Sequence, residues 1–489
     1  MSFSPSLTFF LDRMQGYSTN IFKLESHSKD EATAGDVIVF DMPSNAIINL
    51  RSFKVFFNAN ASTVAGKGAR LPPVQDLFER VEVSVGGIIL SQGTNFVNVL
   101  TEAKKALEGD HTDVAMGHPD YVREVSYVNK KALATTANET YTIANHGNDP
   151  LFCVDRFEGF LGTAEPRLLD TSILPEIRVR ITLASNNVLS TVAAVTLGKA
   201  SGSFSDESGT ANSSGPGPSN APVTGAEYKL SQIHATIECI GLADQTYDNM
   251  IAAMMSQQGF LEIPYKSYDC FQDMHTGSSR FTVSTQSLDR VWVAWRDANF
   301  NSQDTPLIVE GYKSSGAFVS DVANVATGTG NKTDIGKPQF DVGGSLNTNK
   351  EKYVGRYFNF PEPVAHSTAA ESGLGWKAQL QLNGAYYPQF AASLPQLYGI
   401  TKNSVPGRKI KDMSMRQYQK NYCVQCYRLN LIDSEQQRLL SGLDTRSVNL
   451  QGILATQSRN GNPNVNVCIF TESTATLRIG AGRSVEIIN

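Results

Sequence analysis

The 489-residue chain has 41% hydrophobic and 18% charged residues and a formal net charge of −5 at pH 7. This length suggests two or three domains, and no apolar run approaches the roughly 18 residues of a membrane-spanning helix. The negative charge argues against a global basic field for nucleic acid, and six cysteines are too few for a disulfide scaffold. The first residues lack the basic start and apolar core of a secretory signal, so we expect synthesis in a reducing compartment.

Strands are the strongest local signal in the first half of the chain. Apolar and polar residues alternate over Val81–Val85, Ile177–Leu183 and Ile233–Cys239. One buried and one exposed face is typical of antiparallel sandwiches rather than of parallel α/β sheets. Gly86-Gly87 predicts a tight hairpin after the first of these runs, because primed turns need positive φ at their central residues.

Helices are expected to be few and short. An apolar stripe at helical spacing predicts one helix over Phe96–Leu107 and another over Tyr247–Met255. A third is predicted over Asp433–Gly442, with Asp433 as N-cap and Gly442 as C-cap.

The second half repeats the order of the first. Phe260–Tyr268 and the β-rich run Arg280–Trp295 open it, and Trp376–Leu382 then alternates like the earlier strands. Asn383-Gly384 predicts a second hairpin, and a short helix with Leu394 and Leu397 is expected after it. Shared order without shared residue identity indicates two related β-sandwiches.

Two long segments depart from this order. Residues 198–226 are rich in Gly, Ser and Pro and cannot bury a core, so we expect an exposed loop. Residues 297–352 are rich in Gly, Asn and Thr, and predict a second long loop. The expected organisation is an arm at 1–29, a first sandwich at 30–241, a linker helix at 242–259 and a second sandwich at 260–489.

Cys423 and Cys426 form the most metal-like motif. They lie in an expected strand, where residues three apart point to opposite faces. Their Cα atoms would be about 10 Å apart, beyond the roughly 7 Å limit for a disulfide. No second such pair exists to complete a zinc site, so we expect buried structural thiols.

Other candidate sites have simpler explanations. Asp110, His111, Asp113, His118 and Asp120 follow an expected helix end, where such residues usually form solvated turns. Residues 328–333 only approach a phosphate loop, because Asn331 replaces the required glycine. The remaining histidines are scattered through the chain: His27, His146, His234, His275 and His366. We therefore assign no catalytic, cofactor-binding or metal-binding residue.

A basic segment stands out near residue 410. Arg408, Lys409, Lys411, Arg416 and Lys420 lie close together with a single acid among them. The simplest interpretation is a solvated face. The functional alternative is a surface that faces packaged DNA or an anionic membrane.

Three stretches carry a family resemblance. They are Glu82–Leu90, the connection Pro166–Pro175 and Leu382–Pro388. In this order, the sequence resembles the double jelly-roll major capsid proteins, most closely those of polinton-like viruses and virophages. The resemblance spans nearly the whole chain. It implies an all-β fold of two tandem eight-stranded antiparallel jelly rolls with a few short helices.

The resemblance also implies a function. The chain would be a major capsid protein, not an enzyme, that forms homotrimeric, pseudo-hexameric capsomers in the icosahedral shell of a DNA virus. Implied partners are neighbouring capsomers and penton and minor capsid proteins, with an internal membrane or DNA near Arg408, Lys409 and Lys411. The resemblance implies no cofactor or small-molecule substrate. The protein would be made in the host cytoplasm or nucleus, without secretion, and reside in the virion.

Two other classes remain open from the sequence. A tandem β-sandwich adhesin or receptor-binding module would gather aromatic and acidic residues on one loop rim. A β-sandwich glycosidase would need two carboxylates about 5–10 Å apart in a groove. Fold alone does not decide among these classes.

The composition of residues 198–226 generates the first prediction. Limited proteolysis should cut there before it cuts either sandwich, because the segment has high conformational freedom and little apolar area to bury. Mass spectrometry of early fragments would locate the cleavage. Loss of folding on deletion of 202–222 would contradict the assignment.

Overall fold

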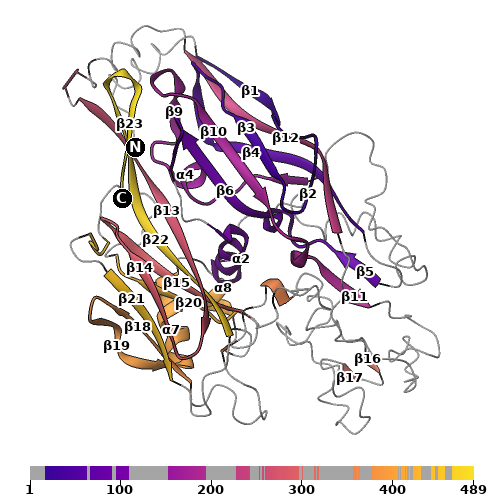
Figure 1. The fold of residues 1–489 in the computed structure, drawn as a ribbon, viewed down its shortest axis with the longest axis vertical. Helices are drawn as coiled ribbons and strands as arrows, with labels where there is room; N and C mark the ends of the chain where they lie inside the picture. The colour runs from indigo at the N-terminus through magenta and orange to yellow at the C-terminus, as the bar shows by residue number, and fades with distance from the viewer. Residues whose placement is uncertain are drawn as a thin grey trace, which may run out of the picture.

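The described strands form two β-sandwiches, one after the other along the chain (Figure 1). Each sandwich has two antiparallel sheets, and its interior is lined by the inward-facing residues of both. The computed structural model describes residues 17–62, 67–90, 95–108, 152–193, 227–242, 259–296, 376–405, 409–413, 422–430, 442–446, 450–457 and 465–489, together with 253, 256–257, 300, 313–314, 317–318, 356–358, 360, 362–363, 407, 415 and 418.

The first sandwich consists of sheets A and B. Sheet A has the order β1 (Tyr17–Glu25), β12 (Glu227–Leu242), β4 (Ile47–Ser62), β8 (Phe152–Val154), with β2 (Glu31–Thr33) on β12 and β9 (Leu168–Asp170) on β4. Sheet B has the order β3 (Val37–Asp41), β10 (Ile177–Leu183), β6 (Phe78–Val85), β7 (Ile88–Ile89). A separate ribbon pairs β5 (Lys67–Arg70) with β11 (Ser190–Ala193).

The second sandwich consists of sheets C and D. Sheet C has the order β13 (Phe260–His275), β22 (Val465–Gly480), β15 (Leu288–Arg296), β20 (Val424–Arg428), with β23 (Ser484–Ile488) on β22. Sheet D has the order β14 (Ser278–Val283), β21 (Leu450–Gln457), β18 (Lys377–Leu382), β19 (Ala385–Ser393). A short ribbon pairs β16 (Lys313–Ser314) with β17 (Ala317–Phe318).

Helices are short and lie beside the sheets. The α-helices are α2 (Val97–Glu108), α4 (Phe160–Thr163), α7 (Leu394–Ser404) and α8 (Lys409–Asp412). The 3-10 turns are η1 (Val74–Leu77), η4 (Thr171–Ile173), η5 (Asn186–Val188), η7 (Arg356–Phe358) and η8 (Ala481–Arg483). None of the helices in these ranges is long and apolar enough to cross a membrane.

The two sandwiches repeat one topology. Sheets A and C share the order of their four main strands, and sheets B and D do the same. The correspondence extends to the segment that follows the last strand in each sheet order, β8 in sheet A and β20 in sheet C. In the first sandwich β9 returns to pair with the start of β4, and in the second Leu443 bridges to Leu288 at the start of β15. The repeat that the sequence predicted is confirmed at this level.

Both predicted hairpins are present. Gly86 and Gly87 have φ values of 60° and 85° between β6 and β7, and Asn383 and Gly384 have 47° and 81° between β18 and β19. A helix follows each hairpin, α2 after the first and α7 after the second, as predicted.

Two sequence-based assignments differ from the structure, and four others lie wholly or mostly outside the described residues. The run Arg280–Trp295 forms two strands on different sheets, β14 and β15, and part of the expected N-terminal arm forms β1. The linker helix at 242–259, the helix Asp433–Gly442 and the loops 198–226 and 297–352 lie wholly or mostly outside the described residues.

His275 is a buried histidine within the second sandwich. Its Nε2 lies 2.6 Å from Thr456 Oγ1, its Nδ1 lies 2.8 Å from Ser279 Oγ, and its ring meets Trp295 edge to face. Burial lowers the pKa of this imidazole to about 4, although Asp273 acts in the opposite direction. The neutral ring is therefore the form that the fold accommodates.

This burial predicts acid sensitivity. The unfolded chain protonates His275 near pH 6.5 and the folded chain near pH 4, so stability should fall as the pH drops through this window. The lost free energy of unfolding should be on the order of 3 kcal/mol. Urea titrations at pH 7 and pH 4 should show a smaller loss for His275→Gln than for the wild type. An identical loss would contradict this assignment.

Candidate functional site

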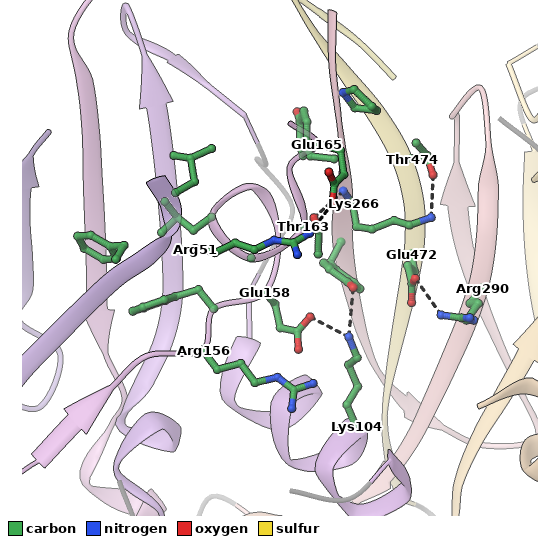
Figure 2. Close-up of a pocket in the computed structure, with 18 of the residues that line it drawn as sticks. Arg51, Lys104, Arg156, Glu158, Thr163, Glu165, Lys266, Arg290, Glu472 and Thr474 are labelled. Carbon is green, nitrogen blue, oxygen red and sulfur yellow. Dashed lines mark hydrogen bonds and ion pairs between the residues drawn. The ribbon is translucent and has the colours of Figure 1, made fainter. Parts of the chain in front are cut away.

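A cavity of about 340 Å³ lies between the two sandwiches. The first sandwich contributes α2, part of β4 and residues 155–165, and the second contributes β13, β15 and β22. Figure 2 shows that Lys104, Glu158, Lys266 and Glu472 converge on this seam from both sides. The second sandwich thus meets the first with charged side chains as well as with apolar contacts such as the edge-to-face pair of Tyr265 and Phe160.

Lys104 is the cation at the centre of the seam. Its ammonium group donates to Glu158 Oε2 at 2.7 Å and to Tyr268 Oη at 3.2 Å. Glu158 follows β8 in the first sandwich, whereas Tyr268 belongs to β13 in the second. Lys104 therefore joins the two domains directly, and it is buried in doing so.

A second group of polar contacts lies on sheet C. Arg290 Nη1 is 3.2 Å from Glu472 Oε1, and Trp292 Nε1 donates to Glu472 Oε2 at 2.9 Å. Lys266 Nζ lies 2.5 Å from Asp289 Oδ2 and 2.8 Å from Thr474 Oγ1. These contacts hold the buried carboxylates in fixed positions under the cavity.

The electrostatics of the seam follow from burial and pairing. Burial would lower the pKa of Lys104, but Glu158, Tyr268, Glu108 and Glu472 outweigh it, and the pKa lies well above its usual value. Burial would raise the pKa of Glu472, but Arg290, Lys104 and Lys266 hold it below its usual value. Both groups are therefore charged at neutral pH.

Glu108 behaves differently at the end of α2. Its burial raises the pKa of the carboxyl despite the nearby Lys104, and Glu158 adds to this effect. Arg156 Nη2 lies 3.5 Å from Glu108 Oε2, which is a weaker contact than the others in the seam. Burial therefore disfavours the ionised form of Glu108.

Arg296 forms a second contact between the domains. Its guanidinium lies 3.6 Å from the ring centroid of Phe300, 4.3 Å from that of Tyr357 and 5.7 Å from that of Phe96. It also donates to the Tyr357 carbonyl at 2.9 Å. Because Phe96 belongs to the first sandwich, a fully buried arginine at the end of β15 helps to fix the helix side of that sandwich.

The charges that line the cavity balance. Its cations are Arg51, Lys104, Arg156, Lys266 and Arg290, and its acids are Glu108, Asp155, Glu158, Glu165 and Glu472. Four of these acids form ion pairs with lining cations. A balanced, internally paired lining gives neither an anion nor a cation a preferred place. The geometry fits a role in joining the domains.

Sequence reasoning missed these residues, although one signal was present. Val291–Trp295 is a continuous apolar run rather than an alternating one. Such runs mark strands that are covered on both faces. Arg290 lies on this covered strand, β15, and Glu472 lies on its neighbour, β22. A charged residue next to such a run predicts a buried ion pair.

The residues singled out in the sequence lie away from the seam or outside the described ranges. Cys423 and Cys426 are buried, the second within β20. Lys411 is exposed on α8, whereas Arg408, Arg416 and Lys420 lie outside the described residues. The cluster at 110–120 and the segment 328–333 also lie outside them. Within the described part of the chain, no group of three His, Cys, Asp or Glu residues could hold a metal ion.

Pairing in the seam predicts the effect of removing its central cation. Lys104→Met should lower the free energy of unfolding by about 3–5 kcal/mol, because Glu158 and Glu472 then lose a buried partner. Chemical denaturation followed by circular dichroism measures this loss. As a control, Arg446→Met breaks an exposed pair with Asp444 and should hardly change the midpoint. Equal effects of the two variants would contradict the role given to Lys104.

Comparison with known proteins identifies the fold. No family model matches the sequence, and no curated protein matches it either. PBCV-1 VP54, in a crystal structure fitted into a cryo-EM reconstruction of the virophage Sputnik, is 13% identical with a TM-score of 0.52, over 97% of each chain. A quasi-atomic structure of the PBCV-1 virus capsid is 12% identical with a TM-score of 0.51, again over 97% of each chain. The chain therefore has the all-β double jelly-roll fold that its sequence predicted.

Proposed function

We propose that this chain is the major capsid protein of an icosahedral DNA virus. The observation that carries the proposal is the match of the complete double jelly roll, over 97% of both chains, to PBCV-1 VP54 and to the PBCV-1 virus capsid. A partial match could reflect one common sandwich. A match to both sandwiches in tandem, with their order along the chain, is far more restrictive.

The repeated topology supports a particular assembly. We propose a first jelly roll at 30–241, to which the preceding segment adds β1, and a second at 260–489. We also propose a homotrimer in which six similar domains make a pseudo-hexagonal tile. A threefold ring requires heterologous contacts, with the first domain of one copy against the second domain of the next. Neighbouring capsomers and penton and minor capsid proteins would then surround each tile, and the protein would reside in the virion after synthesis in the host cytoplasm or nucleus.

The basic segment fits an inner contact of such a shell. Lys411 is exposed on α8, the helix that begins at Lys409. We propose that this helix and the adjoining Arg408 face packaged DNA or an internal anionic membrane.

The rival classes have less support. A glycosidase needs a pair of carboxylates free to act on a sugar, whereas four of the five acids that line the seam cavity form ion pairs with lining cations. No described feature favours an adhesin over a shell protein. We therefore propose a non-enzymatic, structural role.

The proposed function predicts a trimer. Light scattering of the purified chain at micromolar concentration and neutral pH should give three chain masses, because obligate interfaces commonly bury on the order of 2,000 Å² or more. Negative-stain images should show particles of hexagonal outline. A stable, monodisperse monomer would refute the proposed capsomer.

A further inference from the structure

Two cysteines of sheet C meet across neighbouring strands. β13 and β22 pair along their whole length (Figure 1), and their register places Cys270 opposite Phe470. Cys468 lies two residues before Phe470 on β22, so its side chain points to the same face of the sheet as that of Cys270. Diagonal neighbours on one face can interact. Here the two thiols form a hydrogen bond, and neither is part of a disulfide.

Access to this thiol pair comes from the side of β13. This strand is the last one in the described order of sheet C, and Gln272 and Asp273, just beyond Cys270, are exposed. Cys270 itself is half-buried, whereas Cys468 is fully buried. A molecule as small as hydrogen peroxide can therefore approach the two sulfur atoms beside Cys270 without separation of the strands.

Arg296 gives the inner thiol a cationic neighbour. Its Nη1 lies 3.9 Å from Cys468 Sγ. The hydrogen bond from Cys270 and the charge of Arg296 hold the pKa of Cys468 below its usual value, although burial acts in the opposite direction. The same hydrogen bond and burial hold the pKa of Cys270 well above its usual value. Because the thiolate is the nucleophilic form of cysteine, Cys468 is the reactive sulfur and Cys270 the resolving one.

We propose that Cys270 and Cys468 are an oxidation site, at which hydrogen peroxide converts the two thiols of the folded chain into a reversible disulfide. The Cys468 thiolate attacks one peroxide oxygen, the O–O bond breaks and hydroxide leaves, which gives a sulfenic acid. Cys270 Sγ then attacks this sulfur, the S–S bond forms, and the hydroxyl leaves with the Cys270 proton as water. Two electrons pass from the sulfurs to the peroxide. The proton that Cys468 had released neutralises the first hydroxide, so two waters are formed.

The disulfide would strengthen the second sandwich at the face that meets the first. Cys270 and Tyr268 share one face of β13, as Cys468 and Glu472 do on β22, so the bond would hold together the strands that carry these seam residues. It would also close a loop that spans most of the second sandwich. Closing a long loop mainly restricts the unfolded chain, so oxidation should raise the midpoint of thermal unfolding by about 5 °C. This inference does not rest on the proposed capsid role.

The test uses the full-length chain, reduced and then treated with hydrogen peroxide. Peptide mass spectrometry without a reducing agent locates the disulfide, and calorimetry gives the midpoint of unfolding before and after oxidation. Cys270→Ser removes the resolving thiol, and Cys468→Ser removes the reactive one. Cys153→Ser is the matched control, because it removes a buried thiol of β8 whose pKa burial raises to about 11. Circular dichroism confirms that each variant is folded.

Peroxide should link Cys270 to Cys468 in the wild type and in Cys153→Ser and raise the midpoint in both, and dithiothreitol should reverse both effects. Neither Cys270→Ser nor Cys468→Ser should gain the link or the rise. A wild type that lacks the linked peptide, or gains it only after denaturation, would overturn this inference, as would a link without a rise in the midpoint. Should Cys468→Ser fail to fold, Cys270→Ser alone decides, because its position is half-buried and serine keeps a hydrogen-bond donor there.

Discussion

Sheet C is buried on both faces, and this constraint governs how the two halves of the molecule fit together. One face packs against sheet D, and the other lies against α2 and the segment that follows β8. A charged group under such cover needs a partner at hydrogen-bonding distance, because an isolated buried charge is strongly destabilising. Lys104 with Glu158, and Arg290 with Glu472, meet that requirement. The hydrogen bond from Lys104 to Tyr268 runs between the sandwiches, and it helps to set their relative orientation.

Much of this architecture could be read from local patterns. The alternation in Ile177–Leu183 predicts a strand with one buried face, and β10 buries Ile177, Val179, Ile181 and Leu183. The glycines at 86 and 87 predict a hairpin because positive φ is a local property of the backbone. Strand period and turn chemistry are short-range, so a single sequence contains them in full.

The seam could not be read in the same way. Lys104 and Tyr268 are 164 residues apart, and Trp292 and Glu472 are 180 residues apart. The first pair forms only when the two folded sandwiches meet, and the second only when β15 pairs with β22. Neither spacing nor composition specifies these partners. The candidates that the sequence did highlight, such as Cys423 and Cys426, stood out by their motif alone. Both side chains are buried, Cys423 directly before β20 and Cys426 within it.

The covalent link between the sandwiches has a kinetic and thermodynamic consequence. Because α2 and sheet C belong to one chain, their contact forms at the effective concentration set by the tether, which for short linkers is in the millimolar range. The population of such a contact does not change on dilution, so buried charges whose desolvation offsets much of their attraction can still take part in it. In the proposed trimeric capsomer, a ring of six tandem-linked domains would leave only half of its contacts dependent on the concentration of free protein. Its equilibrium would depend on the third power of the chain concentration, where six separate domains would give a sixth-power dependence.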